Sequence, residues 1–244
     1  MTRVCVLQSF RDIDVPDWVS QCLSSVESWA DYHDFEYKYV GDVLLDRVPE
    51  WYRAKVGKKI PVVTDLARLK WIHEELESGA ADIALWLDAD TLIFSPETLR
   101  PMLPGTCCFG REYWLQEKPG GKQKIYRNVH NAYCAFRSGC ATLPFLISTI
   151  EQIVGRVDPD FVAPQLVGPK LLTSLHNTVG FDIDERFGAI SPSLARMLVS
   201  GIDVSQVLGE RDQLIHAANL SNSLVNEIEH QHLVKSLVSF ENGL

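Results

Sequence analysis

The fold is decided by residues 85–94, which read Leu85-Trp86-Leu87-Asp88-Ala89-Asp90-Thr91-Leu92-Ile93-Phe94. The apolar content of residues 82–87 predicts a buried strand, and this strand delivers Asp88 and Asp90 at its carboxyl end, where open α/β sheets bind ligands. Two like charges beside apolar neighbours are costly unless a cation compensates them, and all-oxygen ligands suit Mn²⁺ or Mg²⁺. The segment therefore predicts a metal site at Asp88 and Asp90. The alternative is two solvated aspartates in a loop.

Strands and helices alternate on either side of this segment. Apolar runs predict strands, and apolar residues at helical spacing predict helices. The expected strands are residues 3–9, 35–40, 82–87, 106–109, 129–136 and 182–191. The expected helices are residues 15–30, 62–77, a short one opened by Pro96, 141–154, one starting near Pro169, and 221–238, while residues 44–59 are expected to form a long loop.

This alternation predicts an α/β fold with a mostly parallel central sheet flanked by helices. No repeat, low-complexity tract or composition shift marks a linker in the 244 residues, so a single domain over 1–244 is expected. Within it, residues 1–105 carry the regular strand–helix alternation, and residues 106–244 form a less regular half that ends in the last helix.

Composition excludes several classes of protein. The chain has 46% hydrophobic and 23% charged residues, which is typical of a folded globular protein and not of a disordered one. A net charge of −9 argues against a nucleic-acid-binding protein, because such proteins cluster Lys and Arg. No apolar run approaches the ~20 residues that cross a bilayer. We therefore expect a cytoplasmic protein without a transmembrane segment, with peripheral membrane contact left open.

The six cysteines show no C-x-x-C pair. Four of them lie inside apolar strand-like or helical segments, so we expect reduced, buried thiols and neither disulfides nor a zinc site.

The Leu-Asp-Ala-Asp-Thr-Leu-Ile segment resembles that of the GT-A glycosyltransferases with a DxD motif, in particular the capsular-polysaccharide, galactosyl- and mannosyltransferase types. The resemblance implies a Rossmann-like GT-A domain in which Asp88 and Asp90 hold Mn²⁺ or Mg²⁺ against the diphosphate of a nucleotide sugar. It also implies that residues 1–105 bind the donor and residues 106–244 the acceptor.

Two further segments match the same pattern. Residues 64–71, Thr-Asp-Leu-Ala-Arg-Leu-Lys-Trp, resemble the helix whose Asp and Arg bind donor hydroxyls, which implies that role for Asp65 and Arg68. These two residues share one helix face, so a surface ion pair is the alternative. The segment around Asn131 resembles the strand whose Asn contacts the transferred sugar or the acceptor, although Tyr133 stands where a Gly is usual. His130 beside it is expected to be packed or to face solvent.

The remaining site residues implied by the resemblance lie later and earlier in the chain. Gln165 is placed under the reactive sugar carbon, Lys170 near the phosphates, and His216 in the metal shell, for which imidazole is a normal ligand of Mn²⁺. Gln165 and Lys170 have a surface position as the alternative. Gln8, Ser9 and Phe10 at the end of the first strand are placed near the nucleotide, and His230 and His232 are expected at the surface.

Residues 110–114, Gly-Arg-Glu-Tyr-Trp, carry charged and aromatic side chains suited to an acceptor cleft, with a surface loop as the alternative. The resemblance implies transfer with retention of the anomeric configuration. An inverting enzyme needs a carboxylate base beside the acceptor hydroxyl, and the sequence leaves Glu112, Asp182, Asp184 and Glu185 open for that role.

The expected function is metal-dependent transfer of a hexose-type sugar from a nucleoside diphosphate to a carbohydrate or other hydroxyl acceptor. Two alternatives stay open. One is a phosphatase or phosphotransferase of the haloacid dehalogenase type with Asp88 as nucleophile, although Leu92 stands where that motif has Thr or Val. The other is a non-catalytic protein that binds a nucleotide sugar.

Overall fold

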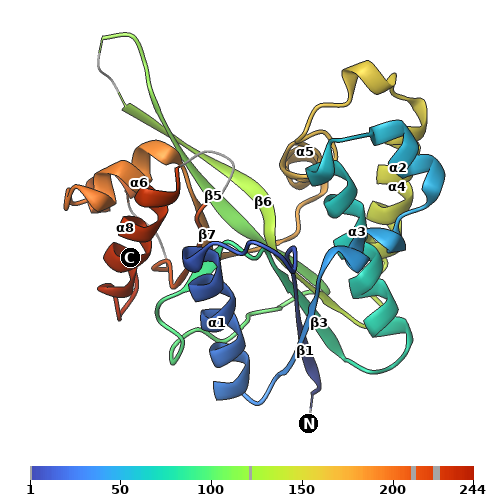
Figure 1. Ribbon diagram of the computed structural model, residues 1–244, viewed down its shortest axis with the longest axis horizontal. Coiled ribbons are helices and arrows are strands. Elements are labelled where there is room, and N and C mark those ends of the chain that lie inside the picture. Colours follow the sequence, from blue (N-terminus) through green and yellow to red (C-terminus); the bar gives the residue numbers. More distant parts are fainter. Residues whose placement is uncertain (1, 121–122, 210–212, 222–225) are drawn as a thin grey trace.

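The computed structural model describes residues 2–120, 123–209, 213–221 and 226–244. Strands and helices alternate along most of it (Figure 1). The strands are β1 (Val4–Ser9), β2 (Glu36–Val40), β3 (Ile83–Leu87), β4 (Thr91–Ile93), β5 (Cys107–Glu117), β6 (Gln123–Arg137), β7 (Asp182–Ile190) and β8 (Ala217–Asn219). The helices are α1 (Asp17–Tyr32), α2 (Glu50–Val56), α3 (Ile60–Glu77), α4 (Thr142–Arg156), α5 (Pro169–Val179), α6 (Pro192–Val199), α7 (Ser205–Leu208) and α8 (Glu227–Val238), with 3₁₀ turns η1 (Asp42–Arg47) and η2 (Pro159–Phe161).

The strands form one mixed sheet in the order β2-β1-β3-β6-β5-β7-β8-β4. Four pairings between described strands are parallel, namely β1–β2, β1–β3, β5–β7 and β7–β8. Three are antiparallel, namely β3–β6, β5–β6 and β4–β8. The prediction of an α/β fold with a largely parallel sheet is confirmed, and the antiparallel strand β6 inserts between the two parallel sets.

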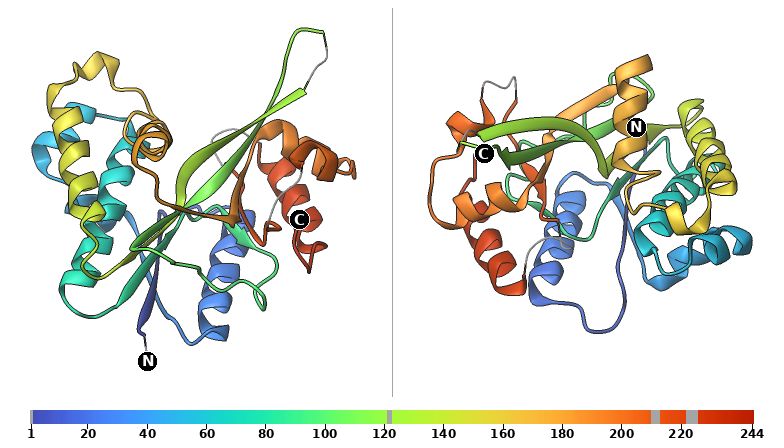
Figure 2. Two further views of the ribbon diagram at one scale, coloured as in Figure 1. Left: turned by 180° about the vertical axis from the view of Figure 1, so that it is seen from behind. Right: turned by 90° about the horizontal axis from the view of Figure 1, so that it is seen from above.

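Helices cover both faces of the sheet, because its strands are apolar on both sides (Figures 1 and 2). Helix α1 packs on one face against Val6, Leu85 and Tyr133. The opposite face packs against α3 and α4 through Trp86 and Phe136. A further cluster joins the start of α1 to α6 and α8.

The expected loop at residues 44–59 is wrong, since this segment folds into η1 and α2. Leu44, Val48, Tyr52 and Val56 are buried and stand four residues apart, which is helical spacing. The sequence signal was present, but charged residues and Pro49 interrupt it.

The helix expected after Pro96 does not form. Residues 96–98 form a turn and residues 99–103 are irregular, because Pro101 and Pro104 cannot take part in a continuous hydrogen-bonded helix. The predicted strands at 106–109 and 129–136 are parts of a much longer hairpin, β5–β6, with a bulge between Phe109 and Gly110. Part of the predicted helix 221–238 lies outside the described residues, and its described part begins at Glu227.

All six cysteines are free and buried, as predicted. Of the two histidines expected at the surface, His232 is exposed but His230 is buried. The His230 ring stacks on Trp18 with centroids 4.0 Å apart, and its Nδ1 and Nε2 lie 2.8 Å and 3.3 Å from the carbonyl oxygens of Asn226 and Leu220. Over the described residues, no helix is at once long and apolar enough to cross a bilayer.

Candidate functional site

Asp88 lies just beyond the carboxyl end of β3. Its Oδ1 accepts a hydrogen bond from Trp86 Nε1 at 2.6 Å and faces Arg68 Nη1 at 2.9 Å. The backbone is fixed as well, since Asp88 N donates to Ala132 O at 2.8 Å. The side chain remains 28% exposed. Asp88 is therefore held by its neighbours yet open to a ligand.

Arg68 is the buried cation of the site. It reaches from α3 to Asp65 Oδ1 at 3.2 Å, to Asp88 Oδ1 at 2.9 Å and to the backbone oxygen of Asn131 at 2.6 Å. Its guanidinium also lies 5.2 Å from the centroid of the Trp86 ring. Burial lowers the pKa of Arg68, but Asp88 and Asp65 outweigh this and leave the pKa raised. The Asp65–Arg68 ion pair is thus buried, which excludes the alternative of an ion pair at the surface.

Asp65 is buried beside Arg68 and accepts a hydrogen bond from Asn131 Nδ2 at 2.7 Å. Burial raises the pKa of Asp65 to about 6, although Arg68 and the hydrogen bond from Asn131 lower it. Asp65, Arg68, Asp88 and Asn131 therefore form one connected network. The structure brings together four residues that the sequence places in three separate segments.

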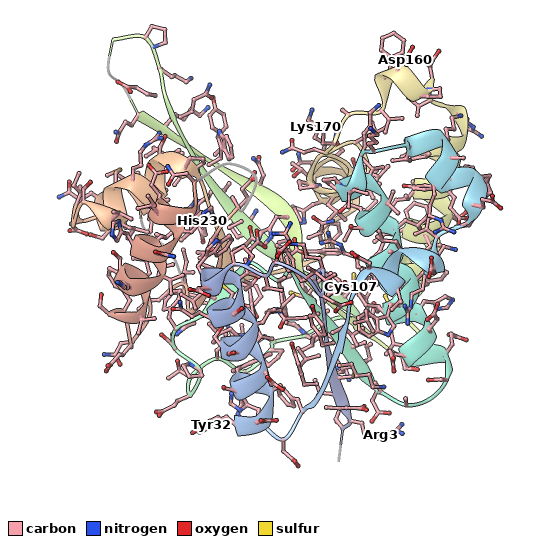
Figure 3. All side chains as sticks on the ribbon, viewed as in Figure 1. Arg3, Tyr32, Cys107, Asp160, Lys170 and His230 are labelled. Carbon is pink, nitrogen blue, oxygen red and sulfur yellow. The ribbon has the colours of Figure 1, made fainter. Side chains whose placement is uncertain are left out.

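The segment that carries Gln165 and Lys170 reaches this network through Gly168. A Cβ built on Gly168 would lie 2.6 Å from Asp65 Oδ2 and 3.3 Å from Asn131 Nδ2. Gln165 and Lys170 themselves are exposed, and neither side chain bonds another described residue. Lys170 lies in the first turn of α5 (Figure 3). Sequence reasoning noted the Gly-Pro helix start but missed the close approach of Gly168.

Asp90 is half-buried on the other side of Asp88. Its Oδ1 accepts a hydrogen bond from Asn219 Nδ2 at 2.6 Å, and its backbone oxygen accepts one from Leu220 N. Asn219 is held in turn, because its Oδ1 accepts from Ser221 N at 3.0 Å. Sequence reasoning missed Asn219, whose only signal is that it ends a short apolar run.

The structure does not bring His216 to the two aspartates. Strands β4 and β8 are antiparallel, so Asn219 pairs with Thr91 beside Asp90, whereas His216 O bonds Phe94 N at the far end. His216 lies three positions before Asn219 along the chain, which is about 10 Å in an extended strand. Its Nδ1 lies 3.1 Å from Thr98 Oγ1. Burial and then Arg186 lower the pKa of His216, so it is neutral where it stands. In this arrangement Asn219, not His216, neighbours Asp90.

The end of β1 contacts the site through Gln8. The Gln8 side chain is fully buried, and it donates to Asp88 O at 3.3 Å and accepts from Tyr37 Oη at 3.0 Å. It therefore positions Asp88 and does not face a ligand. Ser9 Oγ donates to Gly41 O at 3.3 Å, and Phe10 is half-buried under the Arg11 guanidinium at 5.4 Å.

His130 is buried, in line with the expectation that it is packed. Its Nε2 lies 3.2 Å from Phe187 O and its Nδ1 accepts from Ala132 N at 3.1 Å. Burial lowers its pKa to about 4, so the ring is neutral and donates through Nε2. Tyr133 stacks on Phe187 with ring centroids 3.7 Å apart, so the side chain that replaces the usual Gly fills the core.

The donor set fits a hard divalent cation. The Arg68 guanidinium contacts the carboxylates of Asp65 and Asp88, and Asp90 adds a third carboxylate to the site. The site therefore has an excess of negative charge when all three are ionised. Oδ1 of Asp88 contacts Trp86 and Arg68, whereas its Oδ2 has no hydrogen bond or ion pair with any residue that the structure describes. Oδ2 is therefore open to a cation. The carboxylate oxygens of Asp88 and Asp90 would hold Mn²⁺ or Mg²⁺. Within the described ranges no group of three or more His, Cys, Asp or Glu side chains is preassembled to hold a metal, so a bound ion would need water or donor phosphate to complete its shell.

The molecule is similar in structure to a glycosyltransferase involved in glycosylation of the major capsid of PBCV-1. The TM-score is 0.54 at 10% identity, over 95% of this chain and 98% of that chain. Protein A197 from STIV aligns at a TM-score of 0.32 and 13% identity, over 72% and 78% of the two chains. A mutant of Drosophila β-1,4-galactosyltransferase 7, in complex with manganese, UDP-Gal and xylobiose, aligns at 0.30 and 10%, over 73% and 74%. No protein-family model and no curated protein sequence matches. The first likeness shows that the two chains share a fold, the GT-A-like α/β fold expected from the sequence.

Proposed function

From the GT-A fold and the cluster at the end of β3, we infer that the protein is a metal-dependent glycosyltransferase. It transfers a hexose-type sugar from a nucleoside diphosphate to the hydroxyl of a carbohydrate or another acceptor. The observation that carries the proposal is the network of Asp65, Arg68, Asp88 and Asn131. Four polar groups converge at the strand end that carries Asp88 and Asp90, and such convergence of charged side chains in one place is typical of a functional site.

Each group has a distinct role in this proposal. Asp88 and Asp90 are the metal ligands, with Asn219 holding the Asp90 carboxylate in place. The bound ion would neutralise charge that develops on the leaving diphosphate. Asp65 and Asn131 face the donor sugar as hydrogen-bonding groups, and Arg68 balances their charge. In the segment whose Gly168 approaches Asp65, Gln165 is assigned a position under the sugar carbon and Lys170 one near phosphate.

The first test is thermal unfolding with UDP-, GDP-, ADP-, dTDP- and CMP-sugars, each in Mn²⁺, Mg²⁺ or EDTA. A ligand that binds only the folded protein stabilises it by ~2.7 kcal/mol at a hundred times its Kd. We expect one nucleotide class to raise the Tm only with metal. Asp90→Ala should abolish this shift, because it removes one of the two ligands.

Asp82→Ala is the matched control. Asp82 precedes the same strand at its other end, where it pairs with Arg3 at the surface. This variant should keep the metal-dependent shift. A full shift in Asp90→Ala would overturn the proposed metal site.

The same panel separates the alternatives. A nucleotide sugar that stabilises the protein but is neither transferred nor hydrolysed would indicate a binding protein. No shift with any nucleotide sugar, together with hydrolysis of an aryl phosphate that Asp88→Asn abolishes, would indicate the phosphatase. The resemblance in sequence implies retention of the anomeric configuration, whereas the position of Glu112 favours inversion.

A further inference from the structure

A row of paired residues crosses the sheet beside Asp90. Asn128 on β6 pairs with Glu112 on β5, Glu112 with Ala189 on β7, and Ala189 with Asn219 on β8. Paired residues on neighbouring strands point to the same face of a sheet. Asn219 is the residue that bonds Asp90. The row therefore places Glu112 on the same face as Asn219.

The distance along this row is short. Glu112 and Asn219 are two strands apart, about 10 Å between their Cα atoms. The residue between them is Ala189, whose side chain is a single methyl group. Within this row, no side chain longer than a methyl group therefore stands between the Glu112 carboxylate and Asn219.

The Glu112 carboxylate is held in place by its neighbour on β6. Its carboxylate accepts a hydrogen bond from Asn128 Nδ2 at 2.8 Å and is half-buried. Burial raises the pKa of Glu112, although the hydrogen bond from Asn128 lowers it. Its neighbours on β5 point to the opposite face, where Arg111 meets Glu185 at 3.3 Å and Tyr113 is in the core.

The other carboxylates that the sequence left open are engaged elsewhere. Asp182 accepts a hydrogen bond from Gly105 N at 2.7 Å. Asp184 is buried against the Arg186 guanidinium at 2.7 Å, and Glu185 pairs with Arg111. Glu112 alone among the four lies in the row that contains Asn219.

We propose that Glu112 is the catalytic base that takes the proton from the acceptor hydroxyl. This inference rests on the proposed function. The acceptor oxygen forms a bond to the anomeric carbon while its proton moves to the Glu112 carboxylate. The bond from that carbon to the donor phosphate breaks, and its electron pair leaves with the diphosphate. Glu112 then releases the proton to solvent.

This role determines the stereochemistry. A hydroxyl activated by a base attacks the anomeric carbon from the side opposite the leaving group, so the product is inverted. The next pair on the same face of the β5–β6 ribbon is Trp114 and Tyr126, both half-buried. Aromatic faces suit the apolar side of a sugar ring, so the acceptor class is a glycoside whose ring lies on these residues.

The test uses the wild-type protein, Glu112→Gln and the matched control Glu117→Gln, an exposed residue at the end of the same strand. Gln keeps the size of Glu and a carbonyl oxygen for Asn128. Each protein is given α-linked UDP-, GDP- and dTDP-hexoses with MnCl₂, with aryl glycosides as acceptors. We expect Glu112→Gln to lower transfer and donor hydrolysis by about 10²- to 10⁴-fold, as loss of a general base does. Its nucleotide-dependent Tm shift should equal that of the wild type, and Glu117→Gln should be unchanged in both.

The configuration of the product is a second readout. ¹H NMR of the sugar released by the wild type, recorded before mutarotation, should show the β-anomer. An α-anomer, or a Glu112→Gln rate within about tenfold of wild type, overturns the role of Glu112 but leaves the proposed function standing. A wild type that neither binds nor turns over any of these donors overturns both.

Discussion

Arg68 shows at the level of a single residue how the site tolerates its charge. One guanidinium serves the two carboxylates of Asp65 and Asp88, and it is only 4% exposed. Removing one member of a buried ionic group costs about 3–5 kcal/mol, because the remaining charges stay buried without a partner. Arg68 is thus needed for the fold and for the site together, so its loss cannot separate the two.

Asp65 allows a cleaner test through pH. Burial raises its pKa to about 6 in the folded protein, whereas an unfolded Asp titrates near ~3.9. The folded state therefore binds this proton more tightly. The resulting stabilisation is complete below the unfolded pKa and is lost as pH rises through 6. Over about pH 4 to 7 the wild type should lose stability relative to Asp65→Asn, by on the order of 3 kcal/mol at most.

Urea unfolding of both proteins at pH 4, 5, 6 and 7 measures this difference. Asp82→Asn is the control of opposite sign, because Arg3 lowers the pKa of Asp82. Its stabilisation is present above the unfolded pKa and is lost as pH falls. Parallel stability curves for the wild type and Asp65→Asn would show that the Asp65 pKa is not raised.

At the level of elements, the turn that leads into α5 meets helix α3 and strand β6. Gly168 is the residue of closest approach, and any side chain there would push against the Asp65–Asn131 hydrogen bond. The start of α5 is thus part of the site, although its own exposed side chains make no contact with the network.

Gly168→Ala should therefore weaken the site. We expect it to destabilise the protein by about 1–3 kcal/mol, the usual cost of overpacking, and to reduce the metal-dependent Tm shift produced by nucleotide sugars.

Gly155→Ala is the matched control for this change. Gly155 lies within α4, and a Cβ there would meet nothing within 4 Å. Ala should stabilise this helix by ~1 kcal/mol, without effect on the nucleotide shift. A Gly168→Ala protein as stable as Gly155→Ala, with a full shift, would contradict the close approach.

At the scale of the whole molecule, the reactivity of the six buried cysteines measures whether the fold is intact. All six thiols are buried, and burial raises the pKa of Cys5 and of Cys134 to about 12. Cys140 differs, because a hydrogen bond with Cys107 lowers its pKa despite burial. It also lines a cavity of about 170 Å³ beside the start of α4.

The native protein should therefore react with a thiol reagent such as DTNB at Cys140 first, and at the other five only as it unfolds. One equivalent of thionitrobenzoate should be released early from the native protein, and six equivalents in guanidinium. Cys140→Ser should lose the early phase. Early release of several equivalents of thionitrobenzoate, or release of fewer than six in guanidinium, would contradict the burial of the other five thiols.

Local pattern was enough to predict much of this molecule. The apolar run before Asp88 and Asp90 predicted a buried strand with two carboxylates at its end, because burial of a strand and its end is visible in a few consecutive residues. The expected strands at residues 3–9, 35–40 and 182–191 are present, as are the helices at residues 15–30, 62–77 and 141–154, with small shifts at their ends. The predictions of a loop at residues 44–59 and of a helix after Pro96 were wrong, because charged residues and prolines interrupt the apolar periodicity there.

The sequence by itself determined the α/β class, the position of the two aspartates and the residues Asp65, Arg68 and Asn131 as candidates. Only the tertiary structure decided what each touches: Asn131 bonds Asp65 across 66 positions of sequence, and Asn219 bonds Asp90 across 129. It also separated His216 from the aspartates and aligned Glu112 with Asn219 across three strands. The physical reason is that strand order and register are set by the packing of distant segments, whereas periodicity in a sequence reports only which face of its own element is buried.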